Sequence, residues 1–381
     1  MTRYKHPCNI LVISKHDLRA PFHGGARLLL SILGALSYHH NVVYMGFTGI
    51  YDNAKICTEF RNYLTSFYQV TLGYHYKNPF SIHKAASDTI RYTNFFPDII
   101  LCASREYIFA CKLLARKYGA ILLLLQDALR YLYINSFLKA LAVPWYILVT
   151  VMSDVSICVT RDIENRLRKL SLGFKKNIYT IRPTFMLLAD MGKNTNVNEF
   201  LDKLEGFDTI VHYSGPLELL PFLAVRFPCT LFTITGPSAY YAKQYVRDKE
   251  CRNIVLLHNV PDSVLKALYD KLSASIIIRP VMTGISMTVL QSLYFGVPII
   301  ANKAAVLGLE DLVNKYNEKG IIKIFTRWGE LAKTLRDLSN RNRDDLRLRE
   351  TILRIFDENL SPRIFNAKFN AILSEMLSSR V

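Results

Sequence analysis

The sequence predicts an α/β protein built from two successive doubly wound arrays of strands and helices, joined by a linker. Short β-rich runs alternate with helical patterns through the first half of the chain, the alternation breaks at residues 183–208, and it then restarts. Strands that alternate with helices form parallel sheets covered on both faces. A chain of 381 residues is long enough for two such domains.

The elements of each array follow from apolar periodicity and turn residues. In the first array the runs expected as strands are 8–14, 41–47, 98–104, 120–126 and 153–160, and those expected as helices are 26–39 and 106–119, the latter capped by Gly119. In the second array the expected strands are 208–215, 229–236, 253–260, 274–281 and 297–302. A charged helical tract at 327–358 and an amphipathic helix at 360–380 complete the chain.

The charge is positive and uneven. Residues 1–190 carry 23 Lys and Arg against 11 Asp and Glu, a net charge of +12, whereas residues 191–381 carry 25 against 20, a net charge of +5. Such a basic half favours an anionic partner, namely phospholipid head groups, a phosphorylated acceptor or nucleic acid. A surface of solvated lysines without a partner is the alternative. Nucleic acid ranks last, because the strands lack the exposed aromatics of single-strand platforms.

Several classes of protein are not expected. The seven cysteines are scattered without a C-x-x-C pair, which indicates reduced thiols in the cytosol. No Cys/His spacing resembles a zinc site and no D-x-D motif appears, so no metal is expected. The start of the chain lacks a secretory signal. The uncharged run 140–153 contains Pro144 and is shorter than the roughly 20 residues that span a bilayer.

The first expected strand leads into the sequence HGGAR, where Gly24 and Gly25 immediately precede a helix. Two glycines let the backbone approach a ligand closely, and the amides of a helix start attract phosphate. Arg27 adds a donor. A tight turn with nothing bound is the alternative, and the dinucleotide fingerprint is absent because no third glycine follows at the right spacing.

Residues 283–301, TGISMTVLQSLYFGVPIIA, carry the most specific pattern. Gly284 at the strand-to-helix turn and Ser286 just after it place amides and a hydroxyl at a helix start. Gln291, on the first two turns of that helix, would hydrogen-bond vicinal ribose hydroxyls. Arg279, just before the turn, would neutralise a diphosphate. A buried turn without a ligand is the alternative.

Polar residues also end two other strands. Gln126 and Asp127 end the run AILLLLQ, and His258 follows IVLL. Ligands of doubly wound sheets bind beyond the carboxyl ends of the strands, and with two such domains we expect the ligand in a cleft between them. Asp127 would orient a sugar hydroxyl or cap the next helix. His258 would bind the ligand or satisfy a turn.

The whole chain resembles the retaining, nucleotide-sugar-dependent glycosyltransferases of the GT-B fold, and glycosyltransferase family 4 in particular. HGGAR matches the family's glycine loop, PDIILCAS and LLLLQDAL match two central strands, and residues 253–302 match the nucleotide-binding half most closely. The resemblance implies two Rossmann-like doubly wound domains that face a central cleft. The implied boundaries are 1–185 for the acceptor-side domain, 186–207 for the linker, 208–355 for the nucleotide-sugar-binding domain and 356–381 for a helix that crosses back onto the N-terminal domain.

The resemblance also implies an activity and a site. A sugar would pass from a nucleoside diphosphate sugar to a hydroxyl of a glycan or lipid-linked acceptor, without a cofactor or metal. Helix N-termini and cationic side chains would stabilise the leaving diphosphate. The implied catalytic residues are Gln126, Asp127 and Thr283, and the implied nucleotide-sugar-binding residues are Gly24, Gly25, Arg27, Gly215, His258, Arg279, Gly284, Ile285, Ser286 and Gln291.

Some positions depart from the family's pattern. The family normally has Glu where this chain has Thr283 and Gln291, and often has His where it has Gln126. Gln291 keeps an acceptor oxygen for ribose, whereas Thr283 cannot replace a charge. The family's Arg and Lys after the strand VHYS are absent, so diphosphate neutralisation falls to Arg279, Arg226 or another cation. The alternative is a catalytically degenerate GT-B protein that binds a nucleotide or glycan, or acts as a partner subunit.

Residues 131–152 are aromatic and aliphatic, and residues 166–176 add positive charge. This combination suits an anionic membrane surface. Members of the resembling group often act on lipid-linked acceptors at the cytoplasmic membrane face. We therefore expect a cytoplasmic protein or one peripheral to that face; core helices beneath the sheet are the alternative.

Overall fold

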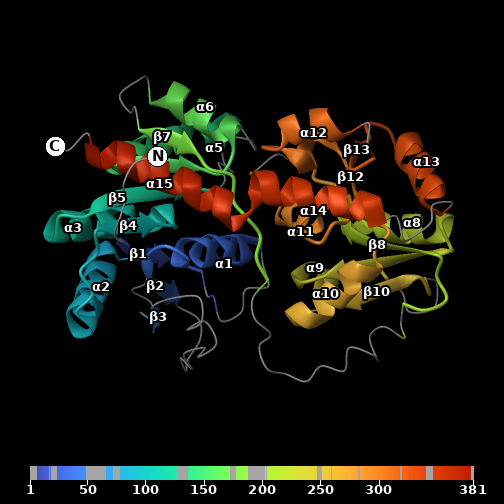
Figure 1. Cartoon of the computed structure of the whole chain (residues 1–381), viewed down its shortest axis with the longest axis horizontal. Helices are drawn as coiled ribbons and strands as arrows, with labels where there is room; N and C mark the ends of the chain where they lie inside the picture. Colours follow the sequence, from blue (N-terminus) through green and yellow to red (C-terminus); the bar gives the residue numbers. More distant parts are fainter. Residues whose placement is uncertain are drawn as a thin grey trace. The chain divides into compact units, whose positions relative to one another are not determined.

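A computed structural model of the chain divides it into two compact units (Figure 1). Unit 1 comprises Met1–Thr184 and Ser361–Val381, and unit 2 comprises Phe185–Leu360. The structure describes residues 7–16, 18, 24–48, 66–71, 78–127, 136–171, 177–187, 202, 204–246, 251–258, 260–281, 284–317, 320–339 and 346–378. Thr283 and most of the expected linker at 186–207 lie outside these described residues.

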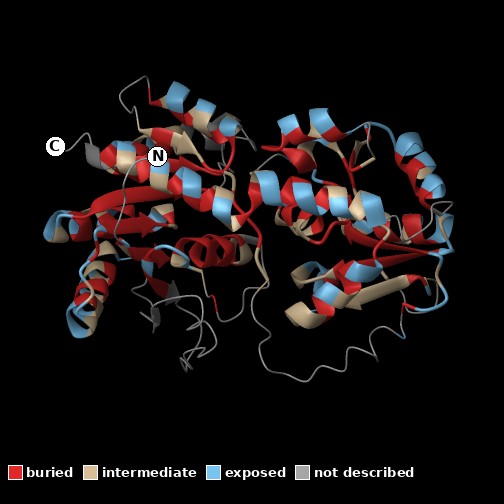
Figure 2. Cartoon of the chain, viewed as in Figure 1, coloured by how far each residue is buried: buried red, intermediate tan, exposed pale blue. Residues whose placement is uncertain are grey.

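Unit 1 contains a parallel sheet of seven strands in the order β3-β2-β1-β4-β5-β6-β7. The strands are β1 (Asn9–Ser14), β2 (Asn41–Thr48), β3 (Ser66–Thr71), β4 (Ile99–Cys102), β5 (Ile121–Gln126), β6 (Val155–Cys158) and β7 (Ile178–Thr180). The chain order reverses at β1, which lies between β2 and β4. Ligands of such sheets bind at this switch point, outside the carboxyl ends of the strands. In β1, β2, β4, β5 and β6 successive apolar residues are buried, so these strands are covered on both faces as their continuous apolar runs predict, whereas in β7 only Ile178 is buried (Figure 2).

The helices of unit 1 are α1 (Gly24–Ser37), α2 (Pro79–Thr93), η3 (Arg105–Tyr107, a 3₁₀ turn), α3 (Ile108–Tyr118), α5 (Ser136–Met152), α6 (Arg161–Leu170) and α15 (Pro362–Ser378). Gly119 ends α3 with φ 69° and donates its N–H to the carbonyl of Ala115, which confirms the predicted C-cap. The expectation that Gly24 and Gly25 precede the first helix is wrong, because α1 begins at Gly24. Their amides belong to the first turn, whose N–H groups have no partner within a helix.

Helix α15 packs on α1, which confirms that the C-terminal helix returns to the N-terminal domain (Figure 1). Asn366 Nδ2 donates to the carbonyl of Ala35 at 2.6 Å. His40 Nε2 lies 2.9 Å from Asn370 Oδ1. Pro362 opens the helix, a position where the missing N–H of proline costs nothing. The returning segment starts at Ser361 in the structure, compared with the expected residue 356.

Unit 2 repeats the architecture with six parallel strands in the order β10-β9-β8-β11-β12-β13. The strands are β8 (Thr209–Ser214), β9 (Thr230–Thr235), β10 (Ile254–Leu257), β11 (Ala274–Ile277), β12 (Ile299–Ala301) and β13 (Ile322–Ile324). The order reverses at β8, so the switch point lies between β8 and β11. Apolar clusters cover the sheet, drawn from strands and helices alike (Figure 2).

The helical elements of unit 2 are η4 (Leu217–Leu219), α8 (Leu220–Arg226), α9 (Pro237–Ala242), α10 (Asp262–Lys271), α11 (Met287–Tyr294), η5 (Lys303–Val306), α12 (Glu310–Tyr316), α13 (Trp328–Ser339) and α14 (Leu346–Leu360). The charged tract expected at 327–358 therefore forms two helices, α13 and α14. Gly296 lets α14 pack closely, since a Cβ at this position would lie 2.6 Å from Arg349 Cγ and its φ of 74° favours glycine.

Candidate functional site

In unit 2 most predicted residues gather at the carboxyl end of the sheet, at the switch point between β8 and β11. Gly215 directly follows β8, Arg279 lies two residues after β11, and residues 284–286 lead into α11. The N–H of Ile278 donates to the carbonyl of Ser214 at 2.8 Å, which keeps the two strand ends adjacent. This is the edge at which doubly wound sheets bind their ligands.

The side chain of Asn302, which directly follows β12, holds the backbone of Arg279. Asn302 Oδ1 accepts from the N–H of Arg279 at 3.0 Å, and Asn302 Nδ2 donates to the carbonyl of Arg279 at 2.8 Å. The Arg279 guanidinium donates to Ser286 Oγ at 3.5 Å. No carboxylate among the described residues pairs with Arg279, so no described group neutralises its positive charge at the start of α11.

The turn before α11 presents backbone amides to the same place. Gly284 has φ 137°, a conformation that only glycine adopts without strain. Ser286 is buried and occupies the N-cap of α11, and Thr288 Oγ1 lies 3.4 Å from Ser214 Oγ. Ile285 and Gln291 are half-buried, and Gln291 lies in the second turn. A helix start with free amides beside a cation attracts an anion such as phosphate.

The glycine after β8 has a packing reason. A Cβ on Gly215 would lie 2.8 Å from the hydroxyl of Tyr213 and 3.1 Å from Cβ of Ile278. That hydroxyl is fixed, because it donates to the carbonyl of Pro216 at 2.6 Å. Glycine therefore keeps the backbone of the edge close to the end of β11.

His212, inside β8, is neutral at ordinary pH. Burial, and to a smaller extent the nearby positive charge of Arg279, lowers its pKa to about 4. Its Nε2 lies 3.0 Å from Thr235 Oγ1, and its Nδ1 has no hydrogen-bond partner within the described part of the chain. The positive charge of Arg279 therefore disfavours protonation of the buried His212 ring.

Two other cations or donors considered from the sequence lie apart from this group. His258 is exposed and directly follows β10, so it shares the edge but sits two strands from β8. Arg226 ends α8, shortly before β9 begins at Thr230. It therefore lies towards the amino ends of the strands, and the expectation that Arg226 could neutralise a diphosphate at the edge is wrong.

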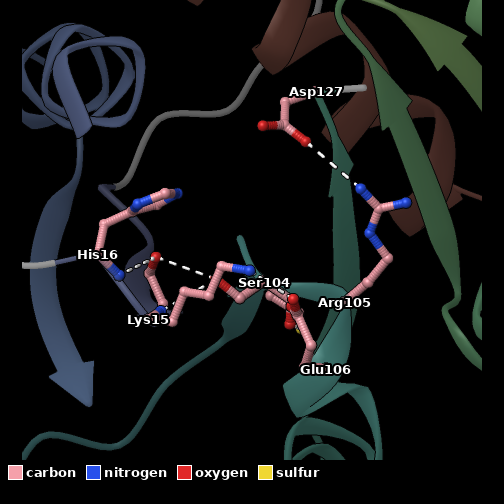
Figure 3. A network of polar contacts seen from close by, with 8 residues as sticks. Lys15, His16, Ser104, Arg105, Glu106 and Asp127 are labelled. Carbon is pink, nitrogen blue, oxygen red and sulfur yellow. Dashed lines mark hydrogen bonds and ion pairs between the residues drawn. The ribbon is translucent and has the colours of Figure 1, made fainter. Parts of the chain in front are cut away.

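Unit 1 carries a second group of polar residues at the carboxyl ends of β1, β4 and β5 (Figure 3). Lys15, after β1, forms an ion pair with Glu106, and its N–H donates to Ser104 Oγ at 2.9 Å. Arg105 Nη2 lies 4.0 Å from Asp127 Oδ1. The Arg105 guanidinium also lies over the Tyr146 ring, 4.9 Å from its centroid. Lys15 and Arg105 therefore each face a carboxylate.

Gln126 is the last residue of β5 and only 1% exposed. Neither its amide nitrogen nor its amide oxygen finds a hydrogen-bond partner among the described residues. A buried amide without partners is costly, because burial removes its water. It is therefore a candidate for binding a polar ligand at this edge. Asp127 beside it has a side chain 41% exposed.

Sequence reasoning missed several of these residues. Lys15, Ser104, Arg105, Glu106 and Asn302 all lie just after strands, which is the only signal that the sequence offered for them. The remaining predicted residues, Gly24, Gly25 and half-buried Arg27, form the first turn of α1 in unit 1. Across the described residues, no three His, Cys, Asp or Glu side chains come close enough to hold a metal ion. No described helix is long and apolar enough to cross a membrane.

A scan against known protein families and a search of curated proteins each found no match to this chain. Solved structures are similar over nearly the whole length. HepE from Anabaena, in complex with UDP, is 12% identical, with 96% of this chain and 100% of that chain covered and a TM-score of 0.67. A glycosyltransferase from Rickettsia africae is 15% identical, with coverage of 98% and 99% and a TM-score of 0.65.

Sucrose-phosphate synthase from Thermosynechococcus elongatus is similar too, at 11% identity, with 97% of this chain and 100% of that chain covered and a TM-score of 0.69. Identities this low show the fold alone, and membership of glycosyltransferase family 4 stays a prediction. The two parallel sheets, their switch points and these similarities agree: the chain adopts the GT-B fold of glycosyltransferases.

Proposed function

We propose that this protein is a retaining, metal-independent glycosyltransferase that moves a sugar from a nucleoside diphosphate sugar to an acceptor hydroxyl. The observation that carries the proposal is the positive charge of Arg279 at the start of α11, beside Ser286 and without a carboxylate partner among the described residues. The fold supports it, since HepE was solved in complex with UDP and with UDP-glucose. Retention and the acceptor follow from the family resemblance.

In this proposal the residues of unit 2 hold the nucleotide. Arg279 and the first amides of α11 neutralise the diphosphate, and Gln291 hydrogen-bonds the ribose hydroxyls. The bond between the sugar and the diphosphate breaks, and the acceptor oxygen bonds to the same carbon. The acceptor's proton leaves with the diphosphate. The barrier falls because the departing charge meets fixed donors rather than reorganising water.

The residues of unit 1 hold the hydroxyl-bearing groups. Gln126 offers a donor and an acceptor that have no partner among the described residues, and Asp127 offers an exposed carboxylate. A carboxylate and an amide are suited to sugar hydroxyls, which donate and accept hydrogen bonds. Thr283, at the position of the family's first Glu, would contact the sugar or its phosphate.

The proposal is tested by incubating the purified protein with a panel of nucleotide sugars and acceptors. Transfer, or slow hydrolysis of one donor, is the expected result. Absence of both binding and hydrolysis across the panel would overturn it.

A second function on the same fold is a nucleotide- or glycan-binding partner subunit without catalysis. Gln291 and Thr283 favour it, because neither supplies the carboxylate that the family carries. The double variant Thr283→Glu with Gln291→Glu separates the two. A large gain in sugar transfer would indicate that the natural chain has lost its catalytic activity. A fall in sugar transfer would show that the natural site works with Thr283 and Gln291 in place.

We also propose that the protein binds an anionic membrane surface and finds its acceptor there. Phe109 and Leu113 on α3 and Leu148 and Val151 on α5 are exposed, and Arg116 on α3 adds exposed positive charge. Such a surface suits the interface of an anionic bilayer. Cosedimentation with phosphatidylglycerol vesicles, but not with phosphatidylcholine vesicles, is expected, and Phe109→Asp with Leu148→Asp should abolish it. Equal recovery with both vesicles would contradict the proposal.

A further inference from the structure

Two aromatic rings stand exposed at the edge of unit 2 that holds Arg279. Tyr240 on α9 is 62% exposed although it is a large aromatic side chain. Its ring centroid lies 5.9 Å from that of His258, with the planes inclined by 51°. His258 is itself exposed. Neither ring is part of the apolar clusters that build the core of this unit.

The backbone places both rings at the carboxyl ends of the strands. Gly236 follows β9 directly, with φ 69° and ψ −155°, a conformation reserved for glycine, and Pro237 then starts α9. The N–H of Gly236 donates to the carbonyl of Leu257 at 3.0 Å, which ties the end of β9 to that of β10. Tyr240 and His258 therefore continue the row of strand ends on which Arg279 lies.

The spacing along this row suits a nucleotide. Strands β10, β9, β8 and β11 are neighbours in that order, and adjacent strands lie about 4.8 Å apart, so β10 and β11 are separated by about 14 Å. With the diphosphate at Arg279 and the ribose at Gln291, the base of a nucleotide that extends across β8 would lie towards β9 and β10. That direction ends at Tyr240 and His258.

We propose that Tyr240, supported by His258, is the stacking platform for the base of the donor nucleotide. The inference rests on the proposed function and names the part of the nucleotide that this second position binds. A planar base presents a π-face that stacks on tyrosine with an offset, and stacking accepts every base. The platform therefore adds affinity for nucleosides without choosing among them.

The test compares binding of UDP, GDP, ADP and inorganic pyrophosphate by calorimetric titration. Tyr240→Ala should weaken the nucleoside diphosphate that the wild type binds by about tenfold or more, the usual loss for one stacked base. Its affinity for pyrophosphate should stay unchanged, because pyrophosphate has no base. Tyr240→Phe should bind as the wild type does. Tyr245→Ala, which removes another exposed tyrosine just after α9, is the matched control and should have no effect.

The outcomes separate this inference from the proposed function. Unchanged affinity of Tyr240→Ala for the nucleoside diphosphate would overturn the platform and leave the function standing. An equal loss for pyrophosphate would also overturn it, because the edge as a whole would then be disturbed. If the wild type binds none of the three nucleoside diphosphates, the proposed function fails and the platform fails with it.

Discussion

The two units share a topology but differ in the charge of their ligand-binding edges. In unit 1 two cations of the edge face a carboxylate, Lys15 that of Glu106 and Arg105 that of Asp127. In unit 2 the guanidinium of Arg279 faces a hydroxyl, and no described carboxylate pairs with it. Among the described residues, the same switch point of a parallel sheet thus carries ion pairs in one unit and a cation without a carboxylate partner in the other.

The difference indicates what each edge can bind. A cation beside the first amides of a helix favours a diphosphate, whereas ion pairs and a buried amide without a described partner favour neutral groups that both donate and accept hydrogen bonds. The topology therefore fixes where ligands bind, and the side chains placed after each strand decide which part of the substrate binds there.

The largest expected effect comes from Arg279→Ala, which removes the positive charge of the unit 2 edge. Affinity for the nucleoside diphosphate should fall by about 100-fold, the upper range for a charge-assisted hydrogen bond. Arg279→Lys should keep part of it. Arg226→Ala, which removes a cation near the amino ends of the strands, is the control for net charge. An equal loss of affinity in the two alanine variants would contradict the conclusion that Arg279 at the carboxyl edge binds the diphosphate.

Gln126→Leu tests the edge of unit 1. Transfer should fall by about 30-fold, the value of two neutral hydrogen bonds of about 1 kcal/mol each, while affinity for the nucleoside diphosphate stays unchanged. The variant's melting temperature should not fall, because leucine replaces a buried amide that has no partner in the described chain. Lower stability with unchanged transfer would instead assign Gln126 to the packing of the sheet.

Asn302→Ala tests how the charge of unit 2 is positioned. KM for the donor should rise about tenfold, the loss of roughly one to two hydrogen bonds, with little change in kcat, because Asn302 acts only through the backbone of Arg279. Asn302→Asp keeps the acceptor for the Arg279 N–H and should recover part of the loss. Asn317→Ala is the control, since Asn317 also bonds a strand backbone, at Ile324 N, 3.4 Å away. A matching rise in KM there would contradict the positioning role.

The smallest effect is a pH dependence of stability that comes from His212. Burial, and then the charge of Arg279, lower the pKa of this ring to about 4. The unfolded chain takes up a proton below about pH 6.5 whereas the folded chain does not, so the stability from this group is lost as pH falls from about 6.5 towards 4. Between pH 8 and pH 6 the loss should be about 1 kcal/mol.

Urea unfolding of the wild type and of His212→Gln at the two pH values measures this loss. The variant keeps a side chain that can hydrogen-bond Thr235 but cannot titrate. Its free energy of unfolding should therefore fall less than that of the wild type, by the amount that His212 contributes. The same change in both proteins would mean that folding does not lower the pKa of His212, which would contradict the influence of burial and of the Arg279 charge on this ring.

Much of the fold could be predicted from the sequence because its cause is local. The buried strands appear as uninterrupted apolar runs such as ILLLLQ, and Gly119 and Gly284 mark turns that need positive φ. The start of α1 is harder to predict. Gly24 and Gly25 indicate a loop because glycine is a poor helix former, although the first turn of a helix tolerates glycine.

The side-chain contacts of the site could not be predicted in this way. Lys15 and Glu106 are 91 residues apart, and Asn302 reaches Arg279 only because β12 lies next to β11 in register. Such pairs depend on strand order, which a single sequence does not fix. Arg226 illustrates the same limit. Its charge is evident from the sequence, but the end of the sheet at which it lies is not.

The most direct test of the account is a crystal structure of the wild type with the nucleoside diphosphate that binds best among UDP, GDP and ADP. The diphosphate should lie within hydrogen-bond distance of the Arg279 guanidinium and of the first amides of α11. A diphosphate bound at the carboxyl edge of unit 1, away from Arg279, would contradict it.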